Sequence, residues 1–339
     1  MSGKEFLTAA VAGYEIGPRV GICMGNEHIA QGWHSGATVG VFAAAAAAAR
    51  GLKLDADKTV HALGIAGTQA SGLMAAQFGS MVKRMHAGRA SQSGLYGALL
   101  AEAGFTGIVN LFESGYGGFC TTFSRSSDRF RRDELTAGLG SVWQTMGVRL
   151  KFYSCVGSNH STLDAIRDMH YERPFRAQDV AKVIVHGSQV TMDHVGWKYV
   201  PQGFTAAQLN LSYCVATLLL DGEVFVDQFT ADKLADPARM ALAEKVDVRH
   251  DPAITAKGPN YRQMVRVEVH LKDGTRMERS RAVSRAKENF AFETDVIKKF
   301  ETLATHALQK TQVAELRGAT LGLERLQDVA QLARLLQKL

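Results

Sequence analysis

The sequence of 339 residues is poor in proline, in cysteine and in long apolar runs. Its 6 prolines fall below the usual share of about 5%. Its four cysteines are widely spaced and form no CxxC pair, so no disulfide framework is expected: Cys23, Cys120, Cys155 and Cys214. The longest apolar run, residues 39–49, is shorter than the roughly 18 residues of a transmembrane helix. The first residues lack the apolar stretch typical of a signal peptide, so we expect none. We therefore expect a protein of the reducing cytoplasm without a membrane-spanning segment.

The motifs of common metal, nucleotide and hydrolase sites are also missing. The sequence has no HExxH, no Cys/His spacing typical of a metal site, no P-loop and no GxSxG. The glycine-rich stretch Gly115–Gly118 lacks the strand-to-helix context of a dinucleotide site and is better explained as a tight turn. We therefore expect no metal site.

Charge of one sign is not concentrated anywhere in the chain. The net charge is +6, and the basic stretches at residues 129–132 and 276–285 are flanked or interrupted by acidic residues. No nucleic-acid-binding motif accompanies them, so we expect no nucleic-acid partner. A mild positive balance suits small anionic substrates.

The overall composition and the apolar patterns predict an ordinary globular protein with many helices. The chain is 46% hydrophobic and 21% charged, which excludes disorder, and it is long enough for about two domains. Apolar spacing, capping residues and terminal glycines predict helices in the first third, and helical patterns return near the end. The predicted helices cover residues 6–14, 37–50 (before Gly51), 55–68 (capped by Asp55), 90–103, 291–308 and 313–339.

The composition changes near residue 145. Ser161 and Asp164 have the spacing of a capping box, which predicts a helix to about Met169. Alternating apolar residues predict strands, and Asp273-Gly274 predicts the turn of a hairpin. The predicted strands cover 180–187, 265–271 and 275–283, and a helix is predicted over 206–220.

These patterns predict an α+β protein with two domains. A large all-helical domain is built from both ends of the chain, residues 1–144 and 286–339. A smaller α+β domain, residues 145–285, is inserted between them.

Two places in the first third gather reactive side chains. His34 precedes the alanine-rich helix, where free backbone N–H groups can bind an anion. Lys83, Arg84 and His86 lie in a glycine-flanked loop before the next helix, which suits the binding of a carboxylate. Each place also has a plainer explanation, a helix-capping loop for the first and a solvated basic loop for the second.

Two further places lie in the inserted domain. Lys151, Ser154 and His160 supply a cation, a hydroxyl and an imidazole near a helix N-terminus, or they form a linker with capping residues. Tyr213 lies inside the predicted helix 206–220, where a tyrosine more often packs in a core. Together, the four places lack the nucleophile–base pair of a hydrolase. They suit the movement of a proton at a carbon next to a carboxylate that Lys and Arg hold.

Residues 67–113 resemble the MmgE/PrpD family, which includes 2-methylcitrate dehydratase, cis-aconitate decarboxylase and iminodisuccinate epimerase. The resemblance continues through residues 150–165, 206–222 and 298–304, and its most specific part is the K-x-x-H-x-G loop that begins at Lys83. It implies a helical domain, a smaller α+β lid, a homodimer and cofactor-free chemistry on di- or tricarboxylates.

The resemblance, taken with the residues themselves, yields catalytic and substrate-binding candidates. The catalytic candidates are His34, Lys83, Lys151 and Tyr213. The substrate-binding candidates are Arg84, His86, Ser154 and His160. In this hypothesis the two lysines neutralise carboxylates and stabilise an enolate-like state, while His34 and Tyr213 transfer the proton.

The resemblance also implies an upstream helical segment with an Asp- and His-bearing motif that lines the pocket, and we expect this chain to lack it. We predict a cofactor-independent dehydratase or epimerase. The sequences Gly-Trp-His-Ser-Gly and Gly-Leu-Met-Ala-Ala-Gln resemble the epimerase branch of the family more than the dehydratase branch. The alternatives are a decarboxylase at the same site and a non-catalytic relative that binds carboxylates.

Overall fold

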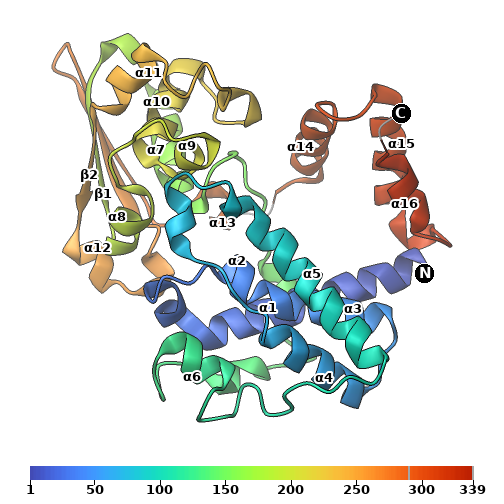
Figure 1. Ribbon diagram of the computed structural model, residues 1–339. Helices are drawn as coiled ribbons and strands as arrows, with labels where there is room; N and C mark the ends of the chain where they lie inside the picture. The colour runs from blue at the N-terminus through green and yellow to red at the C-terminus, as the bar shows by residue number, and fades with distance from the viewer. Residues whose placement is uncertain (289–290, 338–339) are drawn as a thin grey trace. The chain divides into compact units, whose positions relative to one another are not determined.

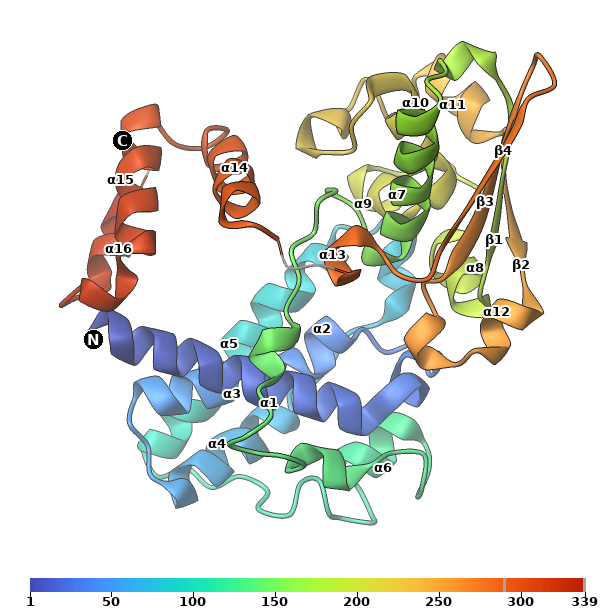
Figure 2. The same ribbon diagram turned by 180° about the vertical axis from the view of Figure 1, so that it is seen from behind.

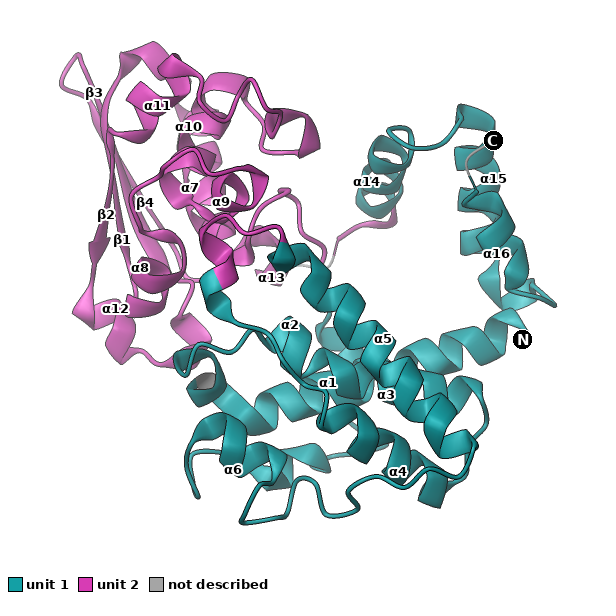
Figure 3. Ribbon diagram, in the orientation of Figure 1, with its two compact units in different colours: residues 1–75, 82–148, 294–339 teal, residues 76–81, 149–293 magenta. Residues whose placement is uncertain are grey.

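The computed structural model describes residues 1–288 and 291–337. The chain forms two compact units, which Figure 3 distinguishes by colour. Unit 1 comprises residues 1–75, 82–148 and 294–339, and unit 2 comprises residues 76–81 and 149–293. Helices and a small mixed sheet occur together, so the predicted α+β class is confirmed. Within the described ranges, no helix is both long and apolar enough to cross a membrane.

Unit 1 is helical (Figure 1). Its α-helices are α1 (Gly3–Ala30), α2 (Ser35–Thr38), α3 (Gly40–Gly51), α4 (Ala56–Gly67), α5 (Val82–Glu102), α6 (Phe119–Ser124), α14 (Glu293–Ala304, whose first residue belongs to unit 2), α15 (Lys310–Leu321) and α16 (Ala330–Leu335). Its 3-10 helices are η2 (Arg132–Leu135), η3 (Gln144–Gly147) and η7 (Leu323–Arg325), while η1 (Met74–Phe78) crosses from unit 1 into unit 2.

The alanine-rich helix α3 packs against both α1 and α5, and small residues bring the three helices close together. A Cβ atom added at Gly17 of α1 would lie 2.8 Å from the Cβ of Ala43. A Cβ added at Gly94 of α5 would lie 2.4 Å from the Cβ of Ala44. Both distances are shorter than real Cβ contacts, so larger side chains at these positions would separate the helices.

A buried ion pair on α1 holds the long connection that follows α6. The Arg19 side chain is 1% exposed and donates hydrogen bonds to the carbonyls of Ala137 at 2.7 Å and Val142 at 2.8 Å. Glu15, one turn earlier, accepts the backbone N–H of Thr145 at 2.8 Å. These bonds satisfy backbone groups in a stretch with little regular structure of its own.

The predicted elements of unit 1 are confirmed in kind, with changes at their ends. The Asp55 side chain caps α4 by accepting the N–H of Lys58, as predicted. Helix α1 extends far beyond the predicted residues 6–14. Helix α5 begins at Val82 rather than at residue 90. The predicted helix over 313–339 is divided into α15, η7 and α16, and its residues 338–339 lie outside the described part.

Unit 2 contains four strands, β1 (Val180–Gly187), β2 (Val246–His250), β3 (Val265–Leu271) and β4 (Arg276–Arg281). Its α-helices are α7 (Gly157–Glu172), α8 (Gln189–Val195), α9 (Phe204–Leu209), α10 (Leu211–Asp221), α11 (Pro237–Ala243), α12 (Pro252–Ala256) and α13 (Arg285–Glu288). Its 3-10 helices are η4 (Ala177–Asp179), η5 (Val226–Gln228) and η6 (Pro259–Tyr261).

The sheet has the order β2-β1-β3-β4. β1 pairs with β2 in parallel, while β1–β3 and β3–β4 are antiparallel. Helices α7 and α10 lie against one face of the sheet (Figure 2), where alternating valines such as Val183, Val267 and Val269 are buried. The predicted strands and the turn at Asp273-Gly274 are therefore confirmed.

Two local predictions in unit 2 were wrong. Helix α7 begins at Gly157, four residues before the predicted cap at Ser161, because Asp164 serves tertiary contacts instead of a helix start. The predicted helix over 206–220 is two helices that meet at Asn210, whose side chain accepts the N–H of Tyr213 and caps α10.

Candidate active site

The turn that carries His34 is fixed by backbone hydrogen bonds to a second segment of unit 1. The N–H of His34 donates to the carbonyl of Gly72 at 3.0 Å, and the N–H of Met74 donates to the carbonyl of Gly32 at 2.8 Å. Between them, Trp33 and Leu73 form an isolated antiparallel bridge. His34 thus lies immediately before α2 on a braced turn, and its side chain is half-buried.

His34 meets His86 of α5. Their Nδ1 atoms are 3.0 Å apart, and the ring centroids are 5.0 Å apart. A hydrogen bond between two Nδ1 atoms requires one protonated and one unprotonated nitrogen. When both rings are neutral, one ring therefore has a basic Nε2 and the other an Nε2–H donor. The pair combines a proton acceptor and a proton donor.

Lys83 lies one helical turn before His86, so both side chains share one face of α5. Burial, and secondly the positive charge of Arg84, lower the pKa of Lys83 to about 8. Burial and the charge of Lys83 in turn lower the pKa of His86, which keeps that imidazole neutral at neutral pH. The Lys83 ammonium donates to the thioether of Met74 at 3.6 Å, which is a weak acceptor.

Lys83, Arg84 and His86 were predicted to lie in a loop, and this was wrong because α5 begins at Val82. The correction strengthens an anion-binding function, since the first backbone N–H groups of a long helix favour negative charge. Arg84 is exposed next to the half-buried Lys83. Gly79 and Gly88 suggested a loop, yet Gly88 lies within the helix, where an added Cβ atom would meet no described atom within 4 Å apart from the neighbouring backbone of its own helix.

In unit 2, Lys151, Ser154 and His160 lie on the segment before α7 and on its first turn. Ser154 is fixed by its backbone, which donates to the carbonyl of Val224 at 2.9 Å and accepts from the Gln208 side chain at 2.9 Å. Lys151 is exposed, whereas His160 is buried. Among the described residues, the Nε2 atom of His160 has no hydrogen-bond partner.

Cys155 joins this group, although the sequence analysis did not select it. Burial raises the pKa of its thiol, but hydrogen bonds with Cys214 and His160 and the charges of His160 and Lys151 outweigh burial and lower it. Cys155 lies between Ser154 and His160 in the sequence, but its contact with Cys214 could not be inferred from two positions so far apart in sequence.

Tyr153 and Asp164 anchor the same segment. The Tyr153 hydroxyl donates to Asp164 at 2.7 Å, and the other carboxylate oxygen of Asp164 accepts the N–H of Arg285 at 2.7 Å. The Arg285 guanidinium lies 3.9 Å from the ring centroid of Phe152. These contacts restrict the backbone that presents Lys151 and Ser154.

Tyr213 lies in the core of unit 2. Its side chain is fully buried, packs against Tyr199 and Phe229, and has the Arg239 guanidinium 5.7 Å from its ring centroid. Its hydroxyl donates to the carbonyl of Lys233 at 3.3 Å. Burial raises the pKa of Tyr213 to about 12. This environment is the core packing that the sequence analysis gave as the plainer explanation of Tyr213.

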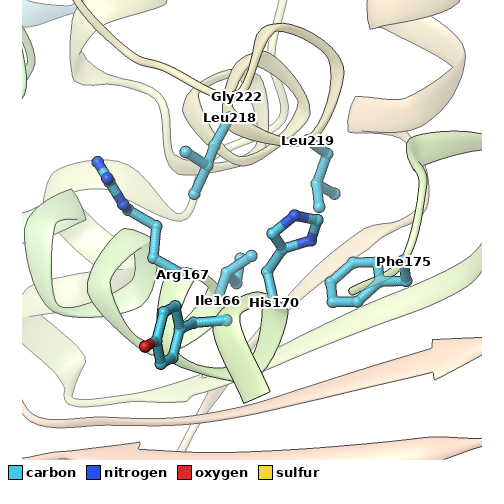
Figure 4. A pocket seen from close by; sticks show the side chains of 8 residues that line it. Ile166, Arg167, His170, Phe175, Leu218, Leu219 and Gly222 are labelled. Atoms are coloured by element: carbon cyan, nitrogen blue, oxygen red, sulfur yellow. The ribbon is translucent and has the colours of Figure 1, made fainter. Parts of the chain in front are cut away.

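Unit 2 also has a surface pocket of about 290 Å³ near the C-terminal ends of α7 and α10 (Figure 4). Leu218 and Leu219 line it from α10, and Arg167 and His170 line it from α7. None of the eight predicted site residues lines this pocket. In the part of the chain that the structure describes, no cluster of three or more His, Cys, Asp or Glu side chains could hold a metal ion.

Comparison with known proteins identifies the family. The MmgE/PrpD N-terminal domain matches residues 1–131, and the MmgE/PrpD C-terminal domain matches residues 153–324. The chain belongs to the MmgE/PrpD family, so the resemblance found in the sequence is confirmed.

Two fungal proteins are similar over 99% of this chain. The cis-aconitate decarboxylase-like protein oryM of Aspergillus oryzae is 35% identical, and the match covers 72% of that protein. A cis-aconitate decarboxylase of Aspergillus terreus is 34% identical, and the match covers 71% of it.

Proposed function

We propose that this chain is an enzyme that processes a di- or tricarboxylate by transferring a proton next to a carboxylate. The observation that carries this proposal is the contact between His34 and His86 beside the desolvated Lys83. An imidazole pair of this kind can deliver or accept a proton, and the ammonium can stabilise negative charge that develops on the substrate.

The names of the relatives favour decarboxylation, the alternative from the sequence analysis, over dehydration or epimerisation. In a decarboxylation the bond to the leaving carboxylate breaks and CO₂ departs. The electron pair left on the carbon framework must then take up a proton. Lys83 would stabilise the electron-rich intermediate, and the His34–His86 pair would deliver the proton. Tyr213 has no part in this scheme because its hydroxyl is buried and bonded to a backbone carbonyl.

Lys151, Ser154 and His160 are proposed to contact substrate carboxylates, as predicted from the sequence. Support for this part is the positive charge of Lys151 and the braced backbone at Ser154. The lid function of the inserted domain, the homodimer and the cytoplasmic location stay predictions.

Proton NMR in D₂O tests the reaction class. The protein is incubated with cis-aconitate, citrate, methylcitrate and iminodisuccinate, and CO₂ release is followed in parallel. A decarboxylase releases CO₂ and places one deuterium on the product carbon. A dehydratase or epimerase incorporates deuterium without CO₂. If a carboxylate stabilises the protein against heat but neither CO₂ release nor deuterium incorporation is seen, the proposal of an enzyme is contradicted and the non-catalytic relative is supported.

A further inference from the structure

A second histidine lies close to the His34 turn but outside the proposed chemistry. His28 is in the last turn of α1, beyond a kink at Gly25, where the backbone leaves helical geometry (φ 59°, ψ −150°). Its side chain is 1% exposed and packs against the rings of Phe119 and Phe123. A polar ring in such surroundings is costly to bury, so its hydrogen bonds show what it contributes.

A hydrogen bond joins one ring nitrogen of His28 to the Thr38 hydroxyl, and a second hydrogen bond joins this hydroxyl to the backbone of His34. The Nε2 atom of His28 lies 2.5 Å from Oγ1 of Thr38. The same Oγ1 donates to the carbonyl of His34 at 3.3 Å. Two backbone bonds close the arrangement, from the N–H of Trp33 to the carbonyl of His28 and from the N–H of Thr38 to the carbonyl of His34.

The proton positions in these hydrogen bonds follow from the number of protons that each group can donate. The Thr38 hydroxyl has a single proton, and when this proton is donated to the His34 carbonyl, the bond with His28 requires a proton on Nε2. Burial lowers the pKa of His28 to about 4, so the ring is neutral at neutral pH and its Nδ1 carries no proton. Consistent with this, Nδ1 of His28 has no partner among the described residues.

The His34 turn leaves little room for the imidazole to adjust if the backbone moves. A Cβ atom added at Gly36 would lie 3.1 Å from Cε1 of His34. A Cβ added at Gly72 would lie 2.4 Å from the Cβ of Ala37 and 3.4 Å from the ring of His86. A shift of the His34 carbonyl would therefore alter the 3.0 Å contact between the two imidazoles.

We propose that His28 and Thr38 are positioning residues that hold the His34 imidazole in register with His86. This inference rests on the proposed function for its effect on turnover, but its structural content does not depend on the reaction. Neither residue is proposed to contact substrate, because their side chains are bonded to each other and to the His34 carbonyl.

The test uses the full chain, four variants of Thr38 and His28, and one control variant. Thr38→Val keeps the shape of the side chain but removes its hydroxyl, whereas Thr38→Ser restores the hydroxyl. His28→Leu removes the donor, whereas His28→Gln can still donate to Thr38. Ser93→Ala is the control, because Ser93 is a buried hydroxyl of α5 without a hydrogen-bond partner in the described structure.

Two readouts are measured on every variant that circular dichroism shows to be folded. Long-range ¹H–¹⁵N spectra of the histidine rings report the proton shared by His34 and His86. Steady-state kinetics report kcat and KM on the carboxylate that the wild-type protein turns over. We expect Thr38→Val and His28→Leu to lose the shared-proton signal and to lower kcat by about ten- to a hundredfold with little change in KM, as small misplacements of reacting groups do.

Thr38→Ser and His28→Gln should recover most of both readouts, and Ser93→Ala should match the wild type. The inference is overturned if Thr38→Val and His28→Leu keep the histidine signal. It is also overturned if Thr38→Ser behaves like Thr38→Val. A wild-type protein that turns over none of the carboxylates contradicts the proposed function. In that case the histidine spectra alone decide the positioning role.

Discussion

Lys83 and Tyr213 were both selected from the sequence as catalytic residues, but their surroundings differ in one decisive respect. The polar atom of Lys83 is partly desolvated and its bond goes to a thioether, a weak acceptor. The hydroxyl of Tyr213 is bonded to a backbone carbonyl, and its ring is enclosed by Tyr199, Phe229 and Arg239.

We infer that unused hydrogen-bonding capacity distinguishes a group that can bind a substrate from a group that only supports the structure. A desolvated ammonium with a poor partner is unfavourable in the free protein and becomes favourable when an anion arrives. A buried tyrosine whose hydroxyl already donates to a backbone carbonyl has less capacity to bind a substrate.

Replacement of Lys83 should have the largest effect. Lys83→Ala removes the charge proposed to hold a carboxylate, and we expect turnover to fall by at least about 10²-fold while the protein stays folded. Lys83→Arg should restore little, because a planar guanidinium does not replace a point charge. Steady-state kinetics with circular dichroism provide the measurement. A loss of only a few-fold would place Lys83 among ordinary surface lysines.

Glu268 of β3 represents the opposite extreme, a buried carboxylate with all its partners in place. It accepts hydrogen bonds from His270, His186 and Arg266, each at 2.9 Å. The bond from His270 foremost, then the bond from His186, the charge of Arg276 and the bond from Arg266, lower its pKa from 4.5 to about 2 despite burial. Glu268→Gln should lower the free energy of unfolding by about 2 kcal/mol at pH 7 and leave kcat unchanged.

The pH dependence of this contribution follows from the direction of the pKa shift. Because the folded-state pKa is lowered, the stabilisation from Glu268 is present above pH 4.5 and is lost as the pH falls toward about 2. The wild type and Glu268→Gln should therefore converge in urea denaturation midpoints across this range. Curves that stay parallel down to pH 2 would contradict the assignment.

The pKa of Lys83 near 8 predicts a loss of turnover on the alkaline side. If the ammonium is the active form, about a tenth of it remains one unit above that pKa, so kcat/KM should fall about tenfold by pH 9. The stability contribution has the opposite sign. Between about pH 8 and 10.5 the unfolded chain binds more protons at this lysine, so folding becomes more favourable as the pH rises. A flat kcat/KM profile through pH 9 would show that Lys83 does not act as a cation.

Tyr213→Phe should have the smallest effect. Removal of the hydroxyl takes one hydrogen bond from the Lys233 carbonyl, which keeps the N–H of Asp236 as a donor. The loss should cost about 1 kcal/mol of stability at most, and turnover should stay close to the wild-type value. Thermal unfolding and kinetics on the same preparation measure both. A large fall in kcat with unchanged stability would return Tyr213 to the catalytic residues.

Local patterns in the sequence predicted the elements well where short-range interactions decide them. The alternation of Val265, Val267 and Val269 predicted β3, and Asp55 predicted the start of α4. Predictions failed where a long-range contact recruits a residue that has a local signature. Asp164 has capping-box spacing, yet it bonds to Tyr153 and Arg285.

The candidate site shows the same limit. The sequence selected His34 and His86 separately, but their contact depends on the packing of α5 against α2 and α3 and could not be derived from a separation of 52 residues. The bond between His28 and Thr38 spans only ten positions, but it crosses a helix kink and a turn whose geometry the residue types do not determine. Resemblance to a family named both residues, and the structure adds that Lys83 has a weak acceptor while the hydroxyl of Tyr213 donates to a backbone carbonyl. The catalytic roles of both stay predictions.

The buried Arg19 and Glu15 of α1 have a consequence for how this chain can vary. These two side chains form hydrogen bonds with the backbone at Ala137, Val142 and Thr145. An insertion between these positions would therefore leave a buried guanidinium and a buried carboxylate without these partners. The neighbouring stretch around Tyr116 is exposed and has no such attachment to α1 among the described contacts. Added residues should therefore be tolerated at Tyr116 and rejected between Ala137 and Thr145, which makes Tyr116 the place to introduce a label or an epitope.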